Sequence, residues 1–133
     1  MKSIFLASAA LCAALSISAC ATNPVTGNTA HMDVTATPSG TDCSQGSPEL
    51  QVYGTPHAAT YYKVRLEDTA DPSADHGEAK VSVNPAGIIP AGAITTGYKA
   101  PCPGTGGHSY RYNVRAVDTL GKVLGTGSYV VTM

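Results

Sequence analysis

The sequence predicts an all-β fold, an antiparallel β-sandwich that forms a single small domain. Glycine and proline supply 14 and 9 of the 133 residues, a share that suits short strands and frequent turns better than helices. Two segments alternate apolar and polar side chains with a period of two, as strands do when one face is buried and the other is wet. Such strands pair in antiparallel sheets. A helical bundle, a coiled coil and a large multidomain enzyme are therefore excluded.

The clearest strand is expected over residues 60–68, where Tyr62, Val64 and Leu66 share one face. A second strong strand is expected over residues 108–117, with tyrosine, valine and alanine in its apolar row. Weaker alternation predicts three more strands, the last of them entered through a turn at Asp118–Gly121. These three cover residues 49–53, 79–83 and 122–132.

The first residues are expected to be a targeting signal. Lys2 precedes an apolar run over residues 4–19, which is short for a membrane span and fits a secretory signal peptide over residues 1–19. The run ends in Ile17-Ser18-Ala19-Cys20, which resembles the bacterial lipobox, and this resemblance implies a diacylglyceryl thioether and an N-acyl chain on Cys20. Ala21, by resemblance to known sorting rules, favours the outer membrane. The alternative is an ordinary cleaved signal that leaves Cys20 as a free thiol.

Residues 20–42 contain almost no large apolar side chains and are expected to form a flexible tether, with at most one edge strand near residues 32–36. The sandwich domain is expected over residues 43–133. Cys43 and Cys102 remain as an even pair in an oxidising compartment, so a disulfide between them is expected. It would contribute roughly 4 kcal/mol by closing a loop of about sixty residues. The alternative is two separate buried thiols.

A candidate site arises where the two strong strands end. The apolar row of residues 60–68 continues to Asp68, and the row of residues 108–117 begins at His108. If these strands are antiparallel neighbours, both side chains lie at one rim of the sheet. A carboxylate beside an imidazole favours the charged form of the imidazole and fixes the tautomer of its neutral form. This suits anion recognition or proton transfer. The alternative is a salt bridge at the strand ends without a ligand.

Seven segments carry a family resemblance, and they are, in chain order, Ser47-Pro48-Glu49-Leu50, Leu66-Glu67-Asp68-Thr69-Ala70-Asp71-Pro72, His76, Ile89-Pro90-Ala91-Gly92, Gly97-Tyr98, Pro101-Cys102-Pro103 and Gly107-His108-Ser109-Tyr110. Together they resemble the phosphatidylethanolamine-binding protein family, which includes bacterial Raf-kinase-inhibitor-like proteins, in a shortened and diverged form. The chain departs from the family pattern at Gly77, where the family has Trp, and at Ser109, where it has Arg.

The resemblance implies a small pocket for phosphate-like anions, lined by Asp68, His76, Pro101, His108 and Tyr110. Because the order of residues in the aspartate-rich segment differs from the family pattern, Asp71 is the alternative to Asp68 in this role. Both histidines would donate to anion oxygens, and Tyr110 would add its hydroxyl. Asp68 would orient a histidine, and Pro101 would shape the wall.

A second resemblance is to immunoglobulin and fibronectin type III sandwiches. Residues 110–118, followed by Gly121, look like the penultimate strand and turn of that fold, and Val130 and Val131 would belong to its last strand. This resemblance implies a structural or protein-interaction module without a catalytic site.

Other functions are not indicated. A formal net charge of -1 gives no basis for nucleic-acid binding. No nucleophile beside a base and no metal-ligand spacing is recognisable, so neither an enzyme, nor a cofactor, nor a metal is expected. The sequence therefore predicts an envelope protein, anchored to the membrane through Cys20, that binds a small anionic ligand without turnover. The alternative is an immunoglobulin-like module with an envelope protein as its partner.

Overall fold

The computed structural model describes residues 28–37, 44–102 and 107–133 of the chain. These ranges form β-strands and contain no helix, so the all-β class is confirmed for them. It follows that no membrane-spanning helix occurs in the part that is described. The predicted signal peptide, Cys20 and Cys43 lie outside the described residues.

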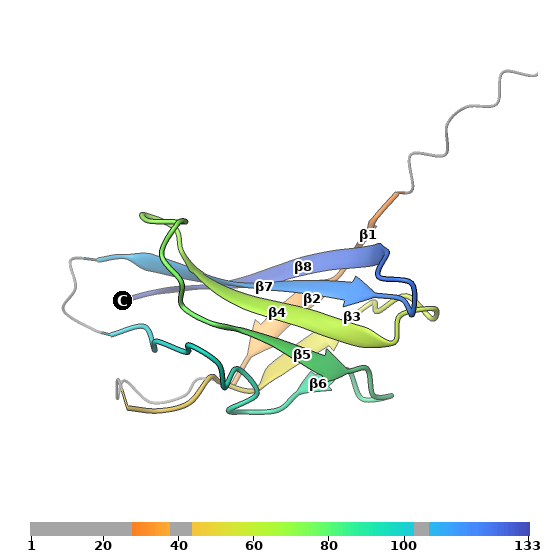
Figure 1. Cartoon of the computed structure of the whole chain (residues 1–133), viewed down its shortest axis with the longest axis horizontal. Coiled ribbons are helices and arrows are strands. Elements are labelled where there is room, and N and C mark those ends of the chain that lie inside the picture. Colours follow the sequence, from red (N-terminus) through yellow and green to blue (C-terminus); the bar gives the residue numbers. More distant parts are fainter. Residues whose placement is uncertain (1–27, 38–43, 103–106) are drawn as a thin grey trace, which may run out of the picture.

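The strands form two sheets (Figure 1). The larger sheet has the order β1-β8-β7-β4-β5. Its members are β1 (Ala30–His31), β8 (Val123–Thr132), β7 (Ser109–Val117), β4 (Tyr61–Asp68) and β5 (Glu78–Ser82). All neighbours in it are antiparallel except β1 and β8, which run parallel. The smaller, antiparallel sheet has the order β2-β3-β6 and consists of β2 (Asp33–Ala36), β3 (Leu50–Tyr53) and β6 (Ile88–Ile89).

The five strands expected from alternation are all present, each within one residue of its expected bounds. The strand β6 was not expected, because two isoleucines followed by Pro90 give no alternation to detect. It pairs with β3 through Leu50 and Gln51.

The segment before residue 43 is more ordered than the expected tether, and the edge strand expected near residues 32–36 is present as β2. Residues 30–36 form β1 and β2, and Met32 between them is only 1% exposed. Gly125 and Gly127 in β8 make room for this segment: a Cβ at Gly127 would overlap the carbonyl oxygen of Met32, and one at Gly125 would lie 3.0 Å from its sulfur. The folded part therefore begins before residue 43, because two distant glycines allow a chain poor in apolar residues to pack closely.

Buried side chains from both sheets form one hydrophobic cluster. The larger sheet contributes the inward rows of β4 and β7, in which Tyr62, Leu66 and Val114 are at most 1% exposed. Leu50 and Ile89 of the smaller sheet are equally buried. The hydroxyl of Tyr62 is satisfied by that of Thr55 at 2.7 Å. The core therefore lies on the faces that period-two alternation predicts.

The pairing of β4 with β7 positions the candidate site. The two strands are antiparallel neighbours, and Asp68 at the end of β4 stands directly opposite Tyr110 near the start of β7. His108 immediately precedes β7. The two chain segments expected to meet at one rim of the sheet do so.

Candidate functional site

The centre of the candidate site is a hydrogen bond between two residues forty positions apart. The Nδ1 atom of His108 lies 2.9 Å from Oδ2 of Asp68. The Asp68 residue is 6% exposed, while 38% of the His108 side chain is exposed. The acid is therefore enclosed at the rim, and the imidazole covers it and faces solvent.

The second oxygen of Asp68 is also occupied. Its Oδ1 atom accepts the backbone N–H of Ala70 at 2.8 Å, within the loop that follows β4. The hydrogen bond from His108, and after it the one from Ala70, hold the pKa of the Asp68 carboxyl below its ordinary value, although burial acts in the opposite direction. Asp68 is therefore an ionised acceptor, and the proton of this hydrogen bond is carried by Nδ1 of His108.

Tyr110 brings a second histidine to the same rim. The His76 ring meets the Tyr110 ring edge to face, with centroids 5.5 Å apart and planes at 75°. The His108 ring lies 6.5 Å from the Tyr110 ring at 39°. Because Tyr110 is only 5% exposed, it is a fixed wall against which both imidazoles rest. Asp68, His76, His108 and Tyr110 thus converge, as the sequence-based hypothesis requires.

A close contact between two loops holds His76 in place. Its Nδ1 atom lies 3.3 Å from the carbonyl oxygen of Lys99, and the Lys99 N–H donates to the His76 carbonyl at 3.3 Å. Between these loops stands Gly77, with a φ of 99°. A Cβ at Gly77 would lie 2.8 Å from the carbonyl oxygen of Thr96. This explains the glycine where the resembled family has Trp: the position has no room for a side chain.

Pro101, the fifth expected site residue, is buried two positions beyond Lys99. Its role as a wall of the site stays a prediction. Sequence reasoning missed a neighbouring contact: the hydroxyls of Tyr98 and Tyr112 lie 3.0 Å apart. Burial raises the pKa of both phenols, and that of Tyr112 more strongly. This pair ties the loop that holds His76 to the core row of β7.

Three polar atoms of the cluster have no hydrogen-bond partner among the described residues. Both imidazoles use Nδ1, His108 toward a carboxylate and His76 toward a carbonyl oxygen, and both of those partners only accept. Each Nε2 therefore presents a lone pair when the ring is neutral and an N–H when it is protonated. The Tyr110 hydroxyl likewise has no partner within those residues. Three polar atoms thus remain for a ligand.

The surrounding charge limits which ligands these atoms can hold. Besides Asp68, the loop between β4 and β5 carries Asp71 and Asp75. Their carboxylates are engaged locally: that of Asp71 accepts from the Ser73 hydroxyl at 2.6 Å, and that of Asp75 accepts the Gly77 N–H at 3.0 Å. An anion is attracted only when the imidazoles are protonated, because neutral imidazoles leave the carboxylates as the net charge.

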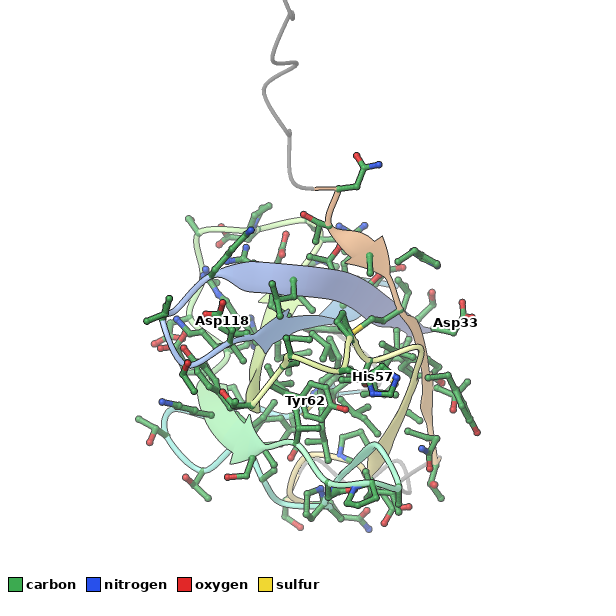
Figure 2. All side chains as sticks on the ribbon, turned by 90° about the vertical axis from the view of Figure 1, so that its right-hand side faces the viewer. Asp33, His57, Tyr62 and Asp118 are labelled. Atoms are coloured by element: carbon green, nitrogen blue, oxygen red, sulfur yellow. The ribbon has the colours of Figure 1, made fainter. Side chains whose placement is uncertain are left out.

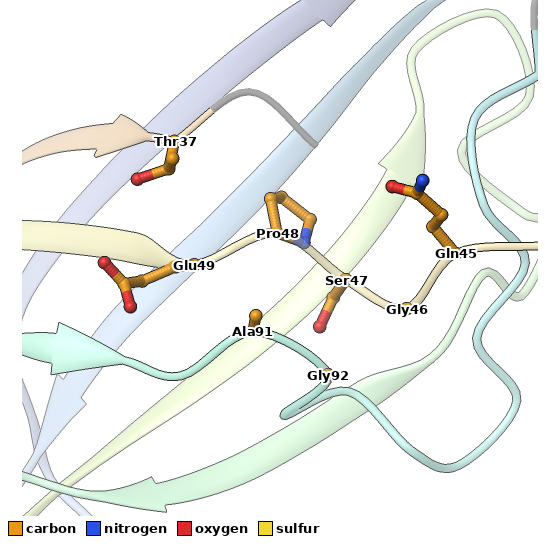
Figure 3. Close-up of a pocket in the computed structure, with 8 residues that line it drawn as sticks. All are labelled: Thr37, Gln45, Gly46, Ser47, Pro48, Glu49, Ala91 and Gly92. Atoms are coloured by element: carbon orange, nitrogen blue, oxygen red, sulfur yellow. The ribbon is translucent and has the colours of Figure 1, made fainter. Parts of the chain in front are cut away.

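The hollows found among the described residues are lined by residues other than Asp68, His76, His108 and Tyr110. One of about 490 Å³ lies between the segment leading into β3 and the segment after β6 (Figure 3). Its lining consists of Thr37, Gln45, Gly46, Ser47, Pro48, Glu49, Ala91 and Gly92. Two segments quoted for the family resemblance thus lie side by side, joined by the Gly92 N–H donating to the Ser47 carbonyl at 2.7 Å.

In the described part of the chain, no group of three histidine, cysteine, aspartate or glutamate side chains is arranged to hold a metal ion. Comparisons with protein families, curated proteins and solved structures find no match to the chain. The disulfide between Cys102 and Cys43 stays a prediction, since Cys43 lies outside the described residues.

Proposed function

We propose that this protein is a lipid-anchored component of the bacterial cell envelope that binds a small, phosphate-like anion at the Asp68–His108 rim. The observation that carries the proposal is the 2.9 Å hydrogen bond from His108 to Asp68, with a second imidazole resting on the same tyrosine. Asp68 keeps Nδ1 of His108 protonated and directs Nε2 outward. Protonation of His108 then creates an outward N–H donor beside a buried counter-charge.

The same geometry gives His76 and Tyr110 their roles. Protonated His76 supplies a second N–H from its Nε2, because Lys99 already occupies its Nδ1. The Tyr110 hydroxyl is a third donor, and its ring fixes the spacing of the two imidazoles. Two or three convergent donors suit a tetrahedral oxyanion, and the neighbouring carboxylates restrict binding to pH values at which the imidazoles are charged.

Binding without turnover is consistent with the hydrogen-bond partners of Ser109 and Thr69, the two hydroxyl residues adjacent in sequence to His108 and Asp68. Ser109 Oγ is hydrogen-bonded to Thr132 Oγ1 at 2.9 Å, and Thr69 Oγ1 donates to the Ser109 carbonyl at 2.7 Å. Each is held by a partner other than His108, so neither forms a nucleophile–base pair with it in this arrangement. Binding without turnover stays part of the proposal.

The strand order favours a second candidate, an immunoglobulin or fibronectin type III sandwich that acts as an interaction module. In that fold one sheet has the order A-B-E and the other contains G-F-C, extended in some members by C′. The order β2-β3-β6, and the order β8-β7-β4-β5 within the larger sheet, correspond to these two arrangements, with β1 added in parallel beside β8. We therefore propose that the two sheets pack face to face as such a sandwich. The rim site can exist on this scaffold, since fold does not fix function.

The anchor is part of the proposal and rests on the lipobox-like residues ending at Cys20. Metabolic labelling with a palmitate analogue tests it: the wild-type chain should carry the label, and Cys20→Ser should not. Equal labelling of the two chains would show that Cys20 is not the acylated residue.

The ligand site is tested by titrating inorganic phosphate into ¹⁵N-labelled protein at about pH 6, within the range where histidines charge. Amide shifts should concentrate at residues 68–70, 76–77 and 108–110 and should disappear in His108→Ala. His57→Ala is the matched control, since His57 is an exposed histidine in another loop. Equal shifts in wild type and His108→Ala would refute the site.

A further inference from the structure

One end of the larger sheet carries a row of like charges. Lys80 of β5 stands directly opposite Lys63 of β4, and Lys63 stands directly opposite Arg115 of β7. All three side chains are exposed. Like charges on directly opposed positions destabilise a sheet. The only ion pairs among the described residues are His31 with Asp33 and His108 with Asp68, so none of these three cations is neutralised.

Acidic side chains on this face lie farther from the same end. Glu78 is opposite Arg65, and Glu67 is opposite Arg111, one and two rows beyond the three cations. The outermost row holds Tyr61, whose ring lies 3.9 Å from Nζ of Lys80. On this face the three opposed cations therefore lie near the end of the sheet where β4 begins and β7 finishes, and Glu78 lines shallow hollows beside Lys63 and Lys80. Two acids outside the face, Asp33 and Asp118, also lie at this end (Figure 2), and Asp33 is paired with His31 at 3.4 Å.

An exposed apolar side chain lies at that same end. The turn between β7 and β8, marked by Asp118 in Figure 2, contains Leu120, which is 90% exposed, and the exposed Lys122. The turn is held firmly, because Asp118 Oδ1 accepts the N–H groups of both residues at 2.8 and 2.9 Å. The Asp118 carboxylate, the acidic group of this turn, is therefore hydrogen-bonded to the backbone of its own turn.

We infer that this end of the domain, formed by Lys63, Lys80, Arg115, Leu120 and Lys122 and called here the basic end, docks on the surface of an anionic phospholipid bilayer. Cations attract the lipid phosphates, and an isolated leucine projecting among them gains by entering the boundary of the acyl chains. A linear acidic glycan or an acidic protein would complement the cations but would give no reason for an isolated projecting leucine.

The path of the chain supports the bilayer as the occupant. Strand β1 pairs with Gly125 and Thr126 near the start of β8, so the described chain begins at the basic end (Figure 1). Between Cys20 and Asn28 the chain can span at most about 28 Å. This geometric support rests on the proposed anchor, which would hold the basic end close to the headgroups. The Asp68–His108 rim lies at the opposite end of β4 and would then face away from the membrane.

Vesicle binding tests the docking independently of the anchor. The chain from residue 20 with Cys20→Ser, which has no acylation site but keeps every described residue, is mixed with vesicles of phosphatidylglycerol and phosphatidylcholine in equal amounts, or with phosphatidylcholine alone. Binding to the anionic vesicles alone, weakened by salt, is expected. Removing three cations by Lys63→Gln, Lys80→Gln and Arg115→Gln should lower the affinity about a hundredfold, or about fivefold for each charge. The matched control, Arg65→Gln, Lys99→Gln and Arg111→Gln, makes the same change in net charge farther from this end, since Arg65 and Arg111 lie one and two rows beyond the three cations.

Leucine insertion gives the second readout. The chain has no tryptophan, so Leu120→Trp is a single fluorescent reporter, and its emission should shift to the blue only with anionic vesicles. Leu120→Ser should weaken binding about tenfold. Equal losses in the two triple variants, an unshifted tryptophan, or binding to a soluble sulfated polysaccharide but not to vesicles would each overturn the inference. Loss of palmitate labelling or of phosphate shifts would instead count against the proposed function.

Discussion

Substitution of Met32 by alanine tests whether residues 30–36 belong to the folded core. Met32 is 1% exposed and lies against Gly125, where even a Cβ would approach its sulfur to 3.0 Å. Shortening such a side chain removes its burial and leaves a cavity, because Gly125, which lies against it, has no side chain that could fill the space. We expect a loss of about 3 kcal/mol in the free energy of unfolding, within the usual range for this change. For a domain of this size, that loss lowers the Tm by about 12 °C.

Urea unfolding followed by circular dichroism measures the effect, with His31→Ala as the control. His31 is the neighbouring residue, is exposed, and takes part only in a surface pair with Asp33. Its removal should change the stability by less than about 0.5 kcal/mol. If Met32→Ala changes the stability as little as His31→Ala does, the segment is a tether and the packing of β1 and β2 described above is wrong.

Four further changes have defined outcomes. Gly77→Ala should cost more than about 2 kcal/mol and disturb the His76 resonances, because its φ is positive and backbone fills the space of the Cβ; a neutral effect would mean that the loops are not in contact. Tyr112→Phe should reduce the loss of stability above about pH 10, since a phenol whose pKa is raised in the folded state stabilises below its unfolded pKa and less as pH rises; unchanged urea midpoints at alkaline pH would contradict this. Asp68→Asn should flatten the fall in stability below about pH 4, because a carboxyl whose folded pKa is lowered stabilises above its unfolded pKa; a slope equal to that of the wild type would be inconsistent with its hydrogen bonds. Reduction of a Cys43–Cys102 disulfide should cost roughly 4 kcal/mol, and two reactive thiols in the denatured, unreduced protein would disprove it.

Local patterns were sufficient for the parts of the molecule that form long strands. The alternation in β4 and β7 predicted both strands, and the ends of their apolar rows predicted that Asp68 and His108 meet. This worked because antiparallel pairing places the end of one strand beside the start of the other.

Two strands that depend on distant partners, β1 and β6, could not be predicted, whereas β2 coincides with the edge strand expected near residues 32–36. β1 and β2 contain few large apolar residues, and Met32 is buried because Gly125 and Gly127, more than ninety positions away, leave space for it. Strand β6 has only two residues and exists through its pairing with β3. Neither the packing of Met32 against the two glycines nor the pairing of β6 with β3 can be recognised from the residues near Met32 or near β6 alone.

The placement of His76 has the same explanation. Its position was expected only from a family resemblance, while the structure holds it through Lys99 and through the contact that Gly77 permits. Loop conformations of this kind depend on glycines with positive φ. Which backbone segments approach such a glycine is determined by the whole fold. The hydrogen bond between Tyr98 and Tyr112 is a further consequence of that loop.

The titration of the His108 Hε1 resonance with and without inorganic phosphate tests the central claim most directly. If phosphate binds the protonated imidazole that Asp68 holds in place, the midpoint of the His108 curve moves to higher pH when phosphate is added, and the exposed His57 does not follow. Identical His108 curves in both buffers would mean that the acid–imidazole pair only closes the end of the sheet.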